Sequence, residues 1–385
     1  MASSSERSLL PIDIIEDIFC RIPVEYLTQF KLTCRQWHAL LKDKRFIYKH
    51  LDLFQDQERF MRIDHTVQII DPVNVARSSS PVPDVFHDVA QISAMVHCDG
   101  LLLCRCKNMS SRGCKLVVWN PFLNRVKWIE PMDFYSSNDF YGIGYDSVCR
   151  DEYKVLRIFD GELDEDESEI AGSCEPKIQI YDFKSDSWRL VDDTTLDWSI
   201  DPPCKGVSVI GNMYWVAHWN NRPELFIQSF DFSTETFKVV SDLPFECDVL
   251  DIAALSSFRG ESLSLLYQHE ETMKIEVWIT NTLSDEVVSW TKYLDVSGFD
   301  LPTLHTDKDL AHPSYIIDTN DSIMVWCEER TEDETNDVCV SVCKISKDGT
   351  VEKQVDAGRC DVCGDDDRPF VCRYVYVPSL VPVPE

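Results

Sequence analysis

The chain has 385 residues, of which 44% are hydrophobic, and its formal net charge is −30. This length and apolar content are typical of a globular protein with a small module and one large domain built of repeats. The acid excess argues against binding to nucleic acid or to an anionic membrane surface, since both need a basic face, and no apolar run reaches the ~18 residues of a membrane span.

The N-terminal segment is expected to be a disordered stretch, residues 1–8, followed by a helical module, residues 9–50. Apolar residues recur at helical spacing from Ile14 to Ile22, on one face, and a second stripe runs from Leu27 to Leu41. Pro11 suits a first helical turn, and Pro23 ends one helix and starts the next. So small a module rarely stabilises itself, so we expect it to pack on the larger domain or to bind a partner.

Three short motifs in this module are informative. They are Leu10-Pro11-Ile12-Asp13-Ile14, Arg21-Ile22-Pro23, and Cys34-Arg35-Gln36-Trp37 with Leu40 and Phe46 downstream. Together they resemble an F-box, with isoleucine at position 14 where leucine is usual. An F-box docks on Skp1, the adaptor of SCF (Skp1–cullin–F-box) ubiquitin ligases, and through Skp1 it joins cullin and RING subunits. The resemblance implies Skp1-facing or helix-core roles, which the sequence does not separate, for Leu10, Pro11, Ile14, Ile18, Leu27, Cys34 and Trp37.

The next segment, residues 51–90, is predicted to be a linker and a first strand. The strand is expected from Thr66 to Ile70. Residues 71–88 contain Ser78-Ser79-Ser80-Pro81-Val82-Pro83 and are expected to form a loop.

The region 91–385 repeats a strand pattern. Short apolar strands recur about once every fifty residues, with steps of 54, 59, 49 and 61 residues, at Leu101, Val155, Tyr214, Leu263 and Met324. Each is followed by an alternating strand, a polar turn and another strand, which is the pattern of propeller blades. We therefore predict a mainly β chain with a small N-terminal α module and a β-propeller-like domain of five or six blades. Val371 to Val377 would pair near Thr66 to Ile70 to close the sixth. A β-sandwich is the alternative fold, but it does not explain the period.

The strands also carry recurrent motifs. Among them are His97-Cys98-Asp99-Gly100, Val118-Trp119-Asn120-Pro121, Tyr141-Gly142-Ile143-Gly144-Tyr145-Asp146 and Ser187-Trp188-Arg189. Over about residues 90–300 they resemble the F-box associated domain of plant F-box proteins, which is kelch-like. The resemblance implies a non-catalytic subunit that recognises a protein substrate for ubiquitination.

Two acid-rich segments interrupt the repeat, at Asp160 to Glu169 and Glu328 to Asp337. They are either solvated connections or a surface that attracts a basic partner. For the second case the candidate substrate-binding residues are Asp164, Glu165, Asp166 and Glu167.

Other classes of function remain as alternatives. A receptor that binds a small molecule in the propeller channel and then recruits a protein is one. A propeller hydrolase is another, but no paired carboxylates stand out, and Cys98 beside His97 is no recognised Cys/His signature. We therefore expect no catalytic residue.

The sixteen cysteines raise the question of disulfides or zinc. The first seven residues contain no apolar signal-peptide core, so we expect free thiols in the nucleus and cytoplasm. Cys360 and Cys363 form half of a zinc site, with Cys372 as a third ligand at most, and no second pair follows. The expectation is no metal and no other cofactor.

Overall fold

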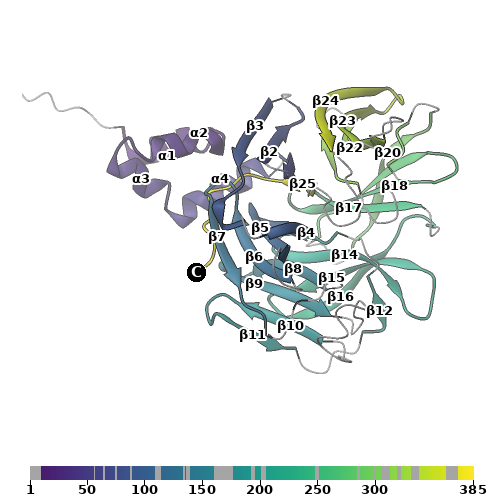
Figure 1. The fold of residues 1–385 in the computed structure, drawn as a ribbon, viewed down its shortest axis with the longest axis horizontal. Coiled ribbons are helices and arrows are strands. Elements are labelled where there is room, and N and C mark those ends of the chain that lie inside the picture. The colour runs from purple at the N-terminus through teal and green to yellow at the C-terminus, as the bar shows by residue number, and fades with distance from the viewer. Residues whose placement is uncertain are drawn as a thin grey trace, which may run out of the picture.

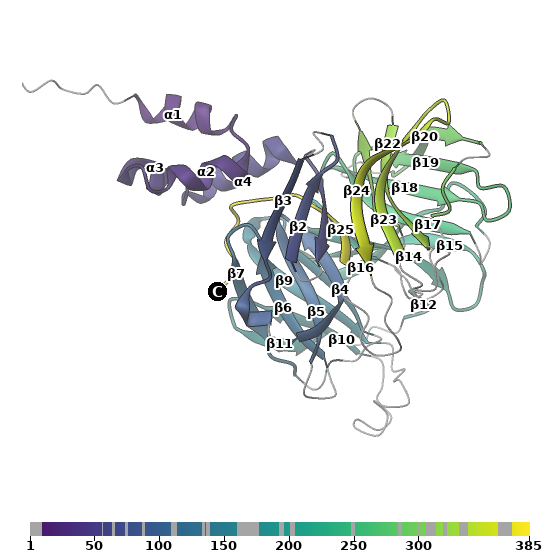
Figure 2. The ribbon, with the colours of Figure 1, turned by 45° about the horizontal axis from the view of Figure 1, so that its top comes forward.

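The structure is a computed structural model of the whole chain. It describes residues 10–385 except 56, 64–65, 74–75, 87–88, 109–113, 133–134, 136–138, 160–176, 192–195, 201–204, 248–250, 284–286, 299–300, 305–312, 319–321, 331–337 and 361–371. Four helices come first, and six antiparallel sheets follow as the blades of a propeller. Figures 1 and 2 place the helices to one side of the propeller.

The helical module consists of α1 (Ile12–Phe19), α2 (Val24–Phe30), α3 (Arg35–Leu40) and α4 (Lys44–Phe54). Proline stands at the N-cap of α1 and of α2, as the sequence predicts. Side chains cap the other two helices: Cys34 Sγ accepts from the backbone of Trp37, and Asp43 accepts from two backbone N–H groups of α4.

Aromatic rings fill the interior of the helical module. Between ring centroids, Phe19 lies 5.5 Å from Phe30, 5.1 Å from Trp37 and 6.5 Å from Phe46 of α4. Such aromatic pairs add about 0.5–1.5 kcal/mol beyond the burial of their area. The four helices are therefore held by one aromatic cluster that ties α4 to α1.

Five blades follow one another along the chain and are numbered 2 to 6, because blade 1 is built from both ends of the propeller domain. Blade 2 contains β4 (Val89–Cys98), β5 (Leu101–Asn108), β6 (Cys114–Asn120) and β7 (Arg125–Ile129). Blade 3 contains β8 (Phe140–Asp146), β9 (Cys149–Phe159), β10 (Lys177–Asp182) and β11 (Ser187–Leu190). Blade 4 contains β12 (Trp198–Ser199), β13 (Val207–Val209), β14 (Asn212–Trp219), β15 (Leu225–Asp231) and β16 (Thr236–Asp242).

The remaining two of these five blades have four strands each. Blade 5 contains β17 (Ile252–Phe258), β18 (Ser262–Gln268), β19 (Ile275–Thr280) and β20 (Trp290–Val296). Blade 6 contains β21 (Tyr315–Asp318), β22 (Ser322–Arg330), β23 (Val338–Ser346) and β24 (Val351–Cys360). The five repeat markers fall on β5, β9, β14, β18 and β22. Each is the strand that follows the innermost position of its blade, so the predicted period and the propeller are confirmed, and the sandwich alternative is wrong.

Blade 1 joins the two ends of the propeller. Its strand order is β25-β1-β2-β3, with β25 (Cys372–Tyr376) from the C-terminal end and β1 (Arg59–Ile63), β2 (Thr66–Asp71) and β3 (Ala76–Pro81) from the beginning. The predicted sixth blade therefore exists, but its strand order differs from the prediction, because an unpredicted strand, β1, lies between the two segments. The C-terminal strand pairs with β1, Phe60 opposite Val375, and β1 lies between it and β2.

The expected loop over residues 71–88 also differs. It contains β3 and a short 3-10 helix, η1 (Asp84–Phe86). Every residue of β3 is exposed, and its strand structure comes only from backbone pairing with β2 at the outer edge of blade 1. Because a polar, serine-rich edge strand has no apolar alternation, the sequence pattern could not reveal it.

The thiols behave as the sequence predicts where the structure describes them. Cys104, Cys327 and Cys343 are buried in strands. Cys339 is half-buried in β23, and Cys247 is half-buried in a connection rather than in a strand. These small apolar side chains fill positions between blades.

Candidate adaptor-binding surface of the helical module

One edge of α1 is apolar and open to solvent. Leu10 is 54% exposed, Ile14 47% and Ile18 44%. Ile14 and Ile18 are four residues apart and so lie in one row along the helix, while Leu10 and exposed Pro11 come directly before it, Pro11 at its N-cap. We call Leu10, Pro11, Ile14 and Ile18 the α1 edge. A row of large apolar side chains in water is costly for a free protein and typical of a binding surface.

The opposite side of α1 is in the core. Ile15 and Phe19 are 4% and 3% exposed, and they pack against the aromatic cluster. The single apolar face expected from Ile14 to Ile22 is therefore two faces, one buried and one exposed. The helix is apolar around more of its circumference than packing within this chain requires.

The remaining predicted residues support this edge from within. Leu27 is fully buried in α2, so it has no surface to present. Trp37 is half-buried against Phe19 and Phe30. Cys34 is exposed, but its sulfur caps α3 by accepting from the backbone N–H of Trp37. The structure thus divides the seven candidates into four surface residues and three that hold the helices.

Sequence reasoning missed three further exposed apolar residues in the part of the module that precedes α4. Ile12 is 40% exposed, Tyr26 57% and Leu32 92%. Their signal was faint, because each stands alone outside an apolar stripe, although Leu32 interrupts an otherwise polar turn between α2 and α3.

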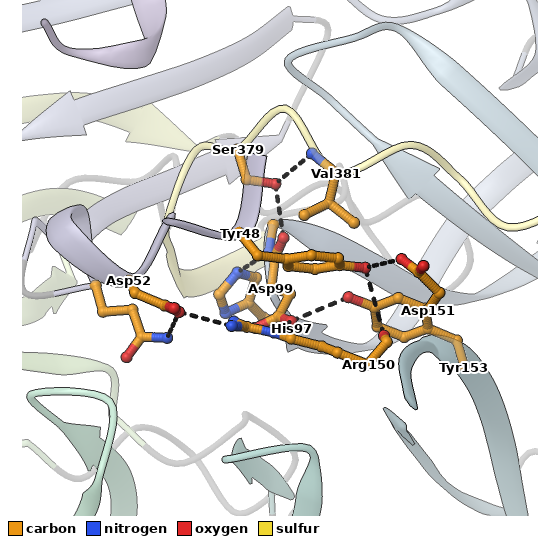
Figure 3. Close-up of polar contacts among 11 residues, drawn as sticks. Tyr48, Asp52, His97, Asp99, Arg150, Asp151, Tyr153, Ser379 and Val381 are labelled. Atoms are coloured by element: carbon orange, nitrogen blue, oxygen red, sulfur yellow. Dashed lines mark hydrogen bonds and ion pairs between the residues drawn. The ribbon is translucent and has the colours of Figure 1, made fainter. Parts of the chain in front are cut away.

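The C-terminal tail, residues 377–385, lies between the helical module and blade 2 (Figures 1 and 2). Asn120 is fully buried and donates to the carbonyl oxygens of Ser379 and Val381, at 3.2 and 2.7 Å. Ser379 Oγ donates to the carbonyl of Asp99, as Figure 3 shows. Val377, Leu380 and Val381 belong to one apolar cluster with residues of all four helices and of blades 2–4. The tail therefore holds the module against the propeller through hydrogen bonds and apolar packing.

His97 anchors the start of this tail. Its Nε2 accepts from the backbone N–H of Gly100 at 2.9 Å and from that of Val377 at 3.4 Å, which requires the neutral ring. Burial lowers the pKa of His97 from 6.5 to about 4, against the raising effects of Asp99 and of the backbone contact. Gly100 is at φ +84°, and a Cβ there would meet Ser379 Oγ at 2.1 Å, so only glycine lets the tail approach.

The pKa of His97 predicts a dependence of stability on pH. The unfolded histidine takes up a proton between pH 6.5 and 4 while the folded one does not, so its contribution is full above pH 6.5 and falls as the pH drops. The loss amounts to about 3 kcal/mol by pH 4. Urea unfolding from pH 7 to pH 4.5 should show a smaller loss in His97→Gln, whose amide oxygen can accept the same bonds. A constant difference between the two proteins across this range would contradict the assignment.

The described residues give little support for catalysis or for metal binding. Burial raises the pKa of the Cys98 thiol well above its ordinary value, so it stays protonated and is a poor nucleophile. Within the described ranges, no group of three or more His, Cys, Asp or Glu is placed to hold a metal ion. Cys363, and with it the half-site that it would form with Cys360, lies outside the described residues. No described helix is long and apolar enough to span a membrane.

Two family comparisons agree with this division of the chain. Residues 8–49 match the F-box domain, and residues 51–383 match the F-box associated beta propeller domain. The chain belongs to the F-box proteins with an F-box associated propeller. The helical module is the F-box, and α4 runs across the boundary between the two matches.

Relatives of this F-box protein are found in Arabidopsis thaliana. One named as an F-box protein, At3g22650, is 81% identical over 384 residues, and the match covers 100% of both chains. The F-box protein At3g08750 is 44% identical with the same coverage, and F-box/WD-40 repeat-containing protein 1 is 44% identical over 99% of this chain and 90% of that protein. Among solved structures, TolB from Acinetobacter baumannii covers 82% of this chain and 68% of its own at 12% identity and a TM-score of 0.41, too remote to support an argument.

Proposed function

We propose that this chain is the substrate-recognition subunit of an SCF ubiquitin ligase. Its F-box binds a Skp1-type adaptor through the α1 edge, and its propeller holds a protein substrate. The observation that carries the proposal is the exposure of Leu10, Ile14 and Ile18 in a module whose family match is the F-box. The adaptor would cover these side chains and remove their apolar surface from water, worth about 25 cal/mol for each Å² buried.

The proposed mechanism is positional. The chain supplies no chemical step; it places a substrate lysine near the ubiquitin that the cullin and RING subunits deliver. Holding two reactants together raises their effective concentration, and a well-oriented pair gains far more than a loosely tethered one. The nucleus and cytoplasm, where the thiols would stay reduced, are the proposed location.

A pull-down tests this function. Tagged wild-type chain and an Ile14→Asp/Ile18→Asp variant are recovered from plant extract and compared by mass spectrometry. Skp1, cullin and RING subunits should be present only with the wild type. Proteins recovered equally with both chains, and lost when the propeller is unfolded, are substrate candidates. Recovery of the ligase subunits with both chains, or with neither, would contradict the proposal.

The substrate-binding prediction for Asp164, Glu165, Asp166 and Glu167 lies outside the described residues. It stays a prediction that these acids steer a basic substrate, with an association rate that falls as salt rises. Replacement of all four with serine should weaken capture of a substrate from the pull-down and flatten its salt dependence. If affinity and salt dependence both stay as in the wild type, the segment serves solubility instead.

A further inference from the structure

Helix α4 has two differently engaged faces. Phe46, Ile47 and Leu51 are buried in the apolar cluster with the other F-box helices, and His50 Nε2 lies 2.8 Å from the carbonyl oxygen of Ile22. Among the polar side chains of α4 that reach the propeller are Lys44, Tyr48 and Asp52, which recur at a spacing of four residues and so form one stripe. The helix therefore packs with the F-box through its apolar face, in a cluster that continues into the propeller, and it adds a polar stripe of contacts to the propeller.

Arg150, at the start of β9, contacts two side chains of this stripe, those of Asp52 and Tyr48. Its Nε and Nη2 donate to the two carboxylate oxygens of Asp99 at 2.8 and 3.0 Å, and its Nη1 donates to Asp52 Oδ1 at 2.6 Å. The guanidinium lies 4.7 Å from the ring centroid of Tyr48 (Figure 3). One planar group thus joins blade 2, blade 3 and α4.

The neighbouring contacts repeat the pattern. Tyr48 Oη donates to Asp151 Oδ1 at 2.9 Å, and Lys44 Nζ donates to Asp151 Oδ2 at 2.8 Å. Tyr153 Oη donates to Asp99 Oδ2 at 3.0 Å, so two side chains of β9 hold Asp99 (Figure 3). We call Tyr48, Asp52, Asp99, Arg150 and Asp151 the joint.

The two halves of the joint differ in how far their side chains are exposed to solvent. The side chains of Arg150 and Asp99 are 23% and 10% exposed, whereas that of Asp52 is 54% exposed. The fork between Arg150 and Asp99 is therefore part of the propeller's own structure, in a partly dry site where charge-assisted bonds are strong. Asp52 docks onto a guanidinium that Asp99 already orients, and the Tyr48 hydroxyl donates to Asp151 beside it.

From this geometry we propose that Arg150 is a positioning residue: it fixes the angle at which the F-box stands on the propeller. The inference rests on the proposed function for its consequence, because a fixed angle keeps a bound substrate at one distance from the ubiquitin donor. An isolated surface ion pair contributes only about 0–1 kcal/mol, which is too little to hold two bodies. Here the contacts converge on one preoriented group, and the tail packs beside them.

The test frees α4 without disturbing the propeller. Tyr48→Phe/Asp52→Ala removes one hydroxyl and one carboxylate, and it leaves the Arg150–Asp99 fork and the ring of residue 48 in place. Spin labels are attached through unnatural amino acids at exposed Leu32 and Val287, because the sixteen cysteines exclude thiol labelling. Pulsed dipolar spectroscopy then gives the distance distribution between the F-box and blade 5 in the free chain.

The wild type should give one narrow distribution, and the double variant should broaden it by about twofold or more as the joint samples other angles. Asp52→Glu, which keeps the carboxylate, should restore a narrow distribution. Asp242→Ala removes an exposed carboxylate far along blade 4 and should change nothing. A distribution in the double variant as narrow as in the wild type would overturn the proposal.

A second readout concerns Skp1. The double variant should bind purified Skp1 with unchanged affinity, because the joint lies on α4 and the α1 edge is untouched. In a reconstituted ligase, the chain's own lysines serve as the probe, and ubiquitin should spread over more of them in the double variant. Loss of Skp1 binding by the double variant alone would mean that the joint supports the F-box fold rather than its angle, and would overturn the inference. Failure of wild-type chain to bind Skp1 would contradict the proposed function but leave the distance measurement standing.

Discussion

Replacing Ile14 and Ile18 with aspartate is expected to abolish Skp1 binding while the chain stays folded. Both side chains are nearly half exposed, so aspartate remains hydrated in the free protein. In the complex two unpaired carboxylates would be buried, at a cost of several kcal/mol, and every 1.4 kcal/mol weakens affinity about tenfold. Titration calorimetry with purified Skp1 should therefore show a loss of at least about a thousandfold.

Two control variants give this result its meaning. Val287→Asp introduces the same charge at a 73% exposed apolar position of the propeller, and it should bind Skp1 like the wild type. Ile15→Ala removes buried apolar volume beside the α1 edge and should lower stability by about 2–5 kcal/mol without abolishing binding in the folded fraction. Equal Skp1 affinity for the wild type and the Ile14→Asp/Ile18→Asp variant would contradict the assignment of this edge.

Deletion of residues 372–385 is expected to prevent the propeller from folding as a closed ring. The deletion removes β25 from the inner position of blade 1 and exposes β1, whose residues Phe60 and Met61 are fully buried. It also removes Tyr376 and Val381, each with no exposed surface, and each such side chain contributes about 1.5–3 kcal/mol by burial. The sum approaches the whole stability of an ordinary domain, about 5–15 kcal/mol.

Thermal unfolding followed by circular dichroism measures this effect. The shortened chain should be insoluble or unfold far below the wild type. Deletion of residues 384–385 alone is the matched control, since Glu385 is exposed at the end of the tail, and it should leave the melting temperature unchanged. A melting temperature of the 372–385 deletion equal to that of the wild type would mean that the C-terminal strand does not close the ring.

The sequence predicts the repeated part of the fold well, because each blade repeats an apolar strand next to the innermost position. Five such strands were recognisable from their period. Blade 1 was not, because it is assembled from both ends of the chain: β1 begins within five residues of α4, and β3 is an exposed polar edge. Pairing between segments three hundred residues apart leaves no periodic signal in the sequence.

The sequence predicted the candidate surface only in part. The F-box motif contains Ile14, Ile15, Ile18 and Phe19 together, and helical periodicity alone could not say which pair faces outward. Packing against Phe30, Trp37 and Phe46 decides it.

The joint could not be predicted, because its five residues come from α4, the turn after β4 and the start of β9. Their only sequence signal was local. Asp99-Gly100 forms the tight turn between β4 and β5, with both residues at positive φ, and Lys44, Tyr48 and Asp52 follow helical spacing across the expected end of the module at residue 50. Which partners they meet depends on the closure of the ring.

The central claim, that this chain links a Skp1-type adaptor to the propeller, is tested most directly by assembly from purified parts. Full-length chain, Skp1 and the N-terminal half of a cullin are mixed and analysed by size-exclusion chromatography with light scattering. We predict a single peak whose mass equals one copy of each. Elution of the chain by itself, with Skp1 and cullin together in a separate peak, would contradict the account.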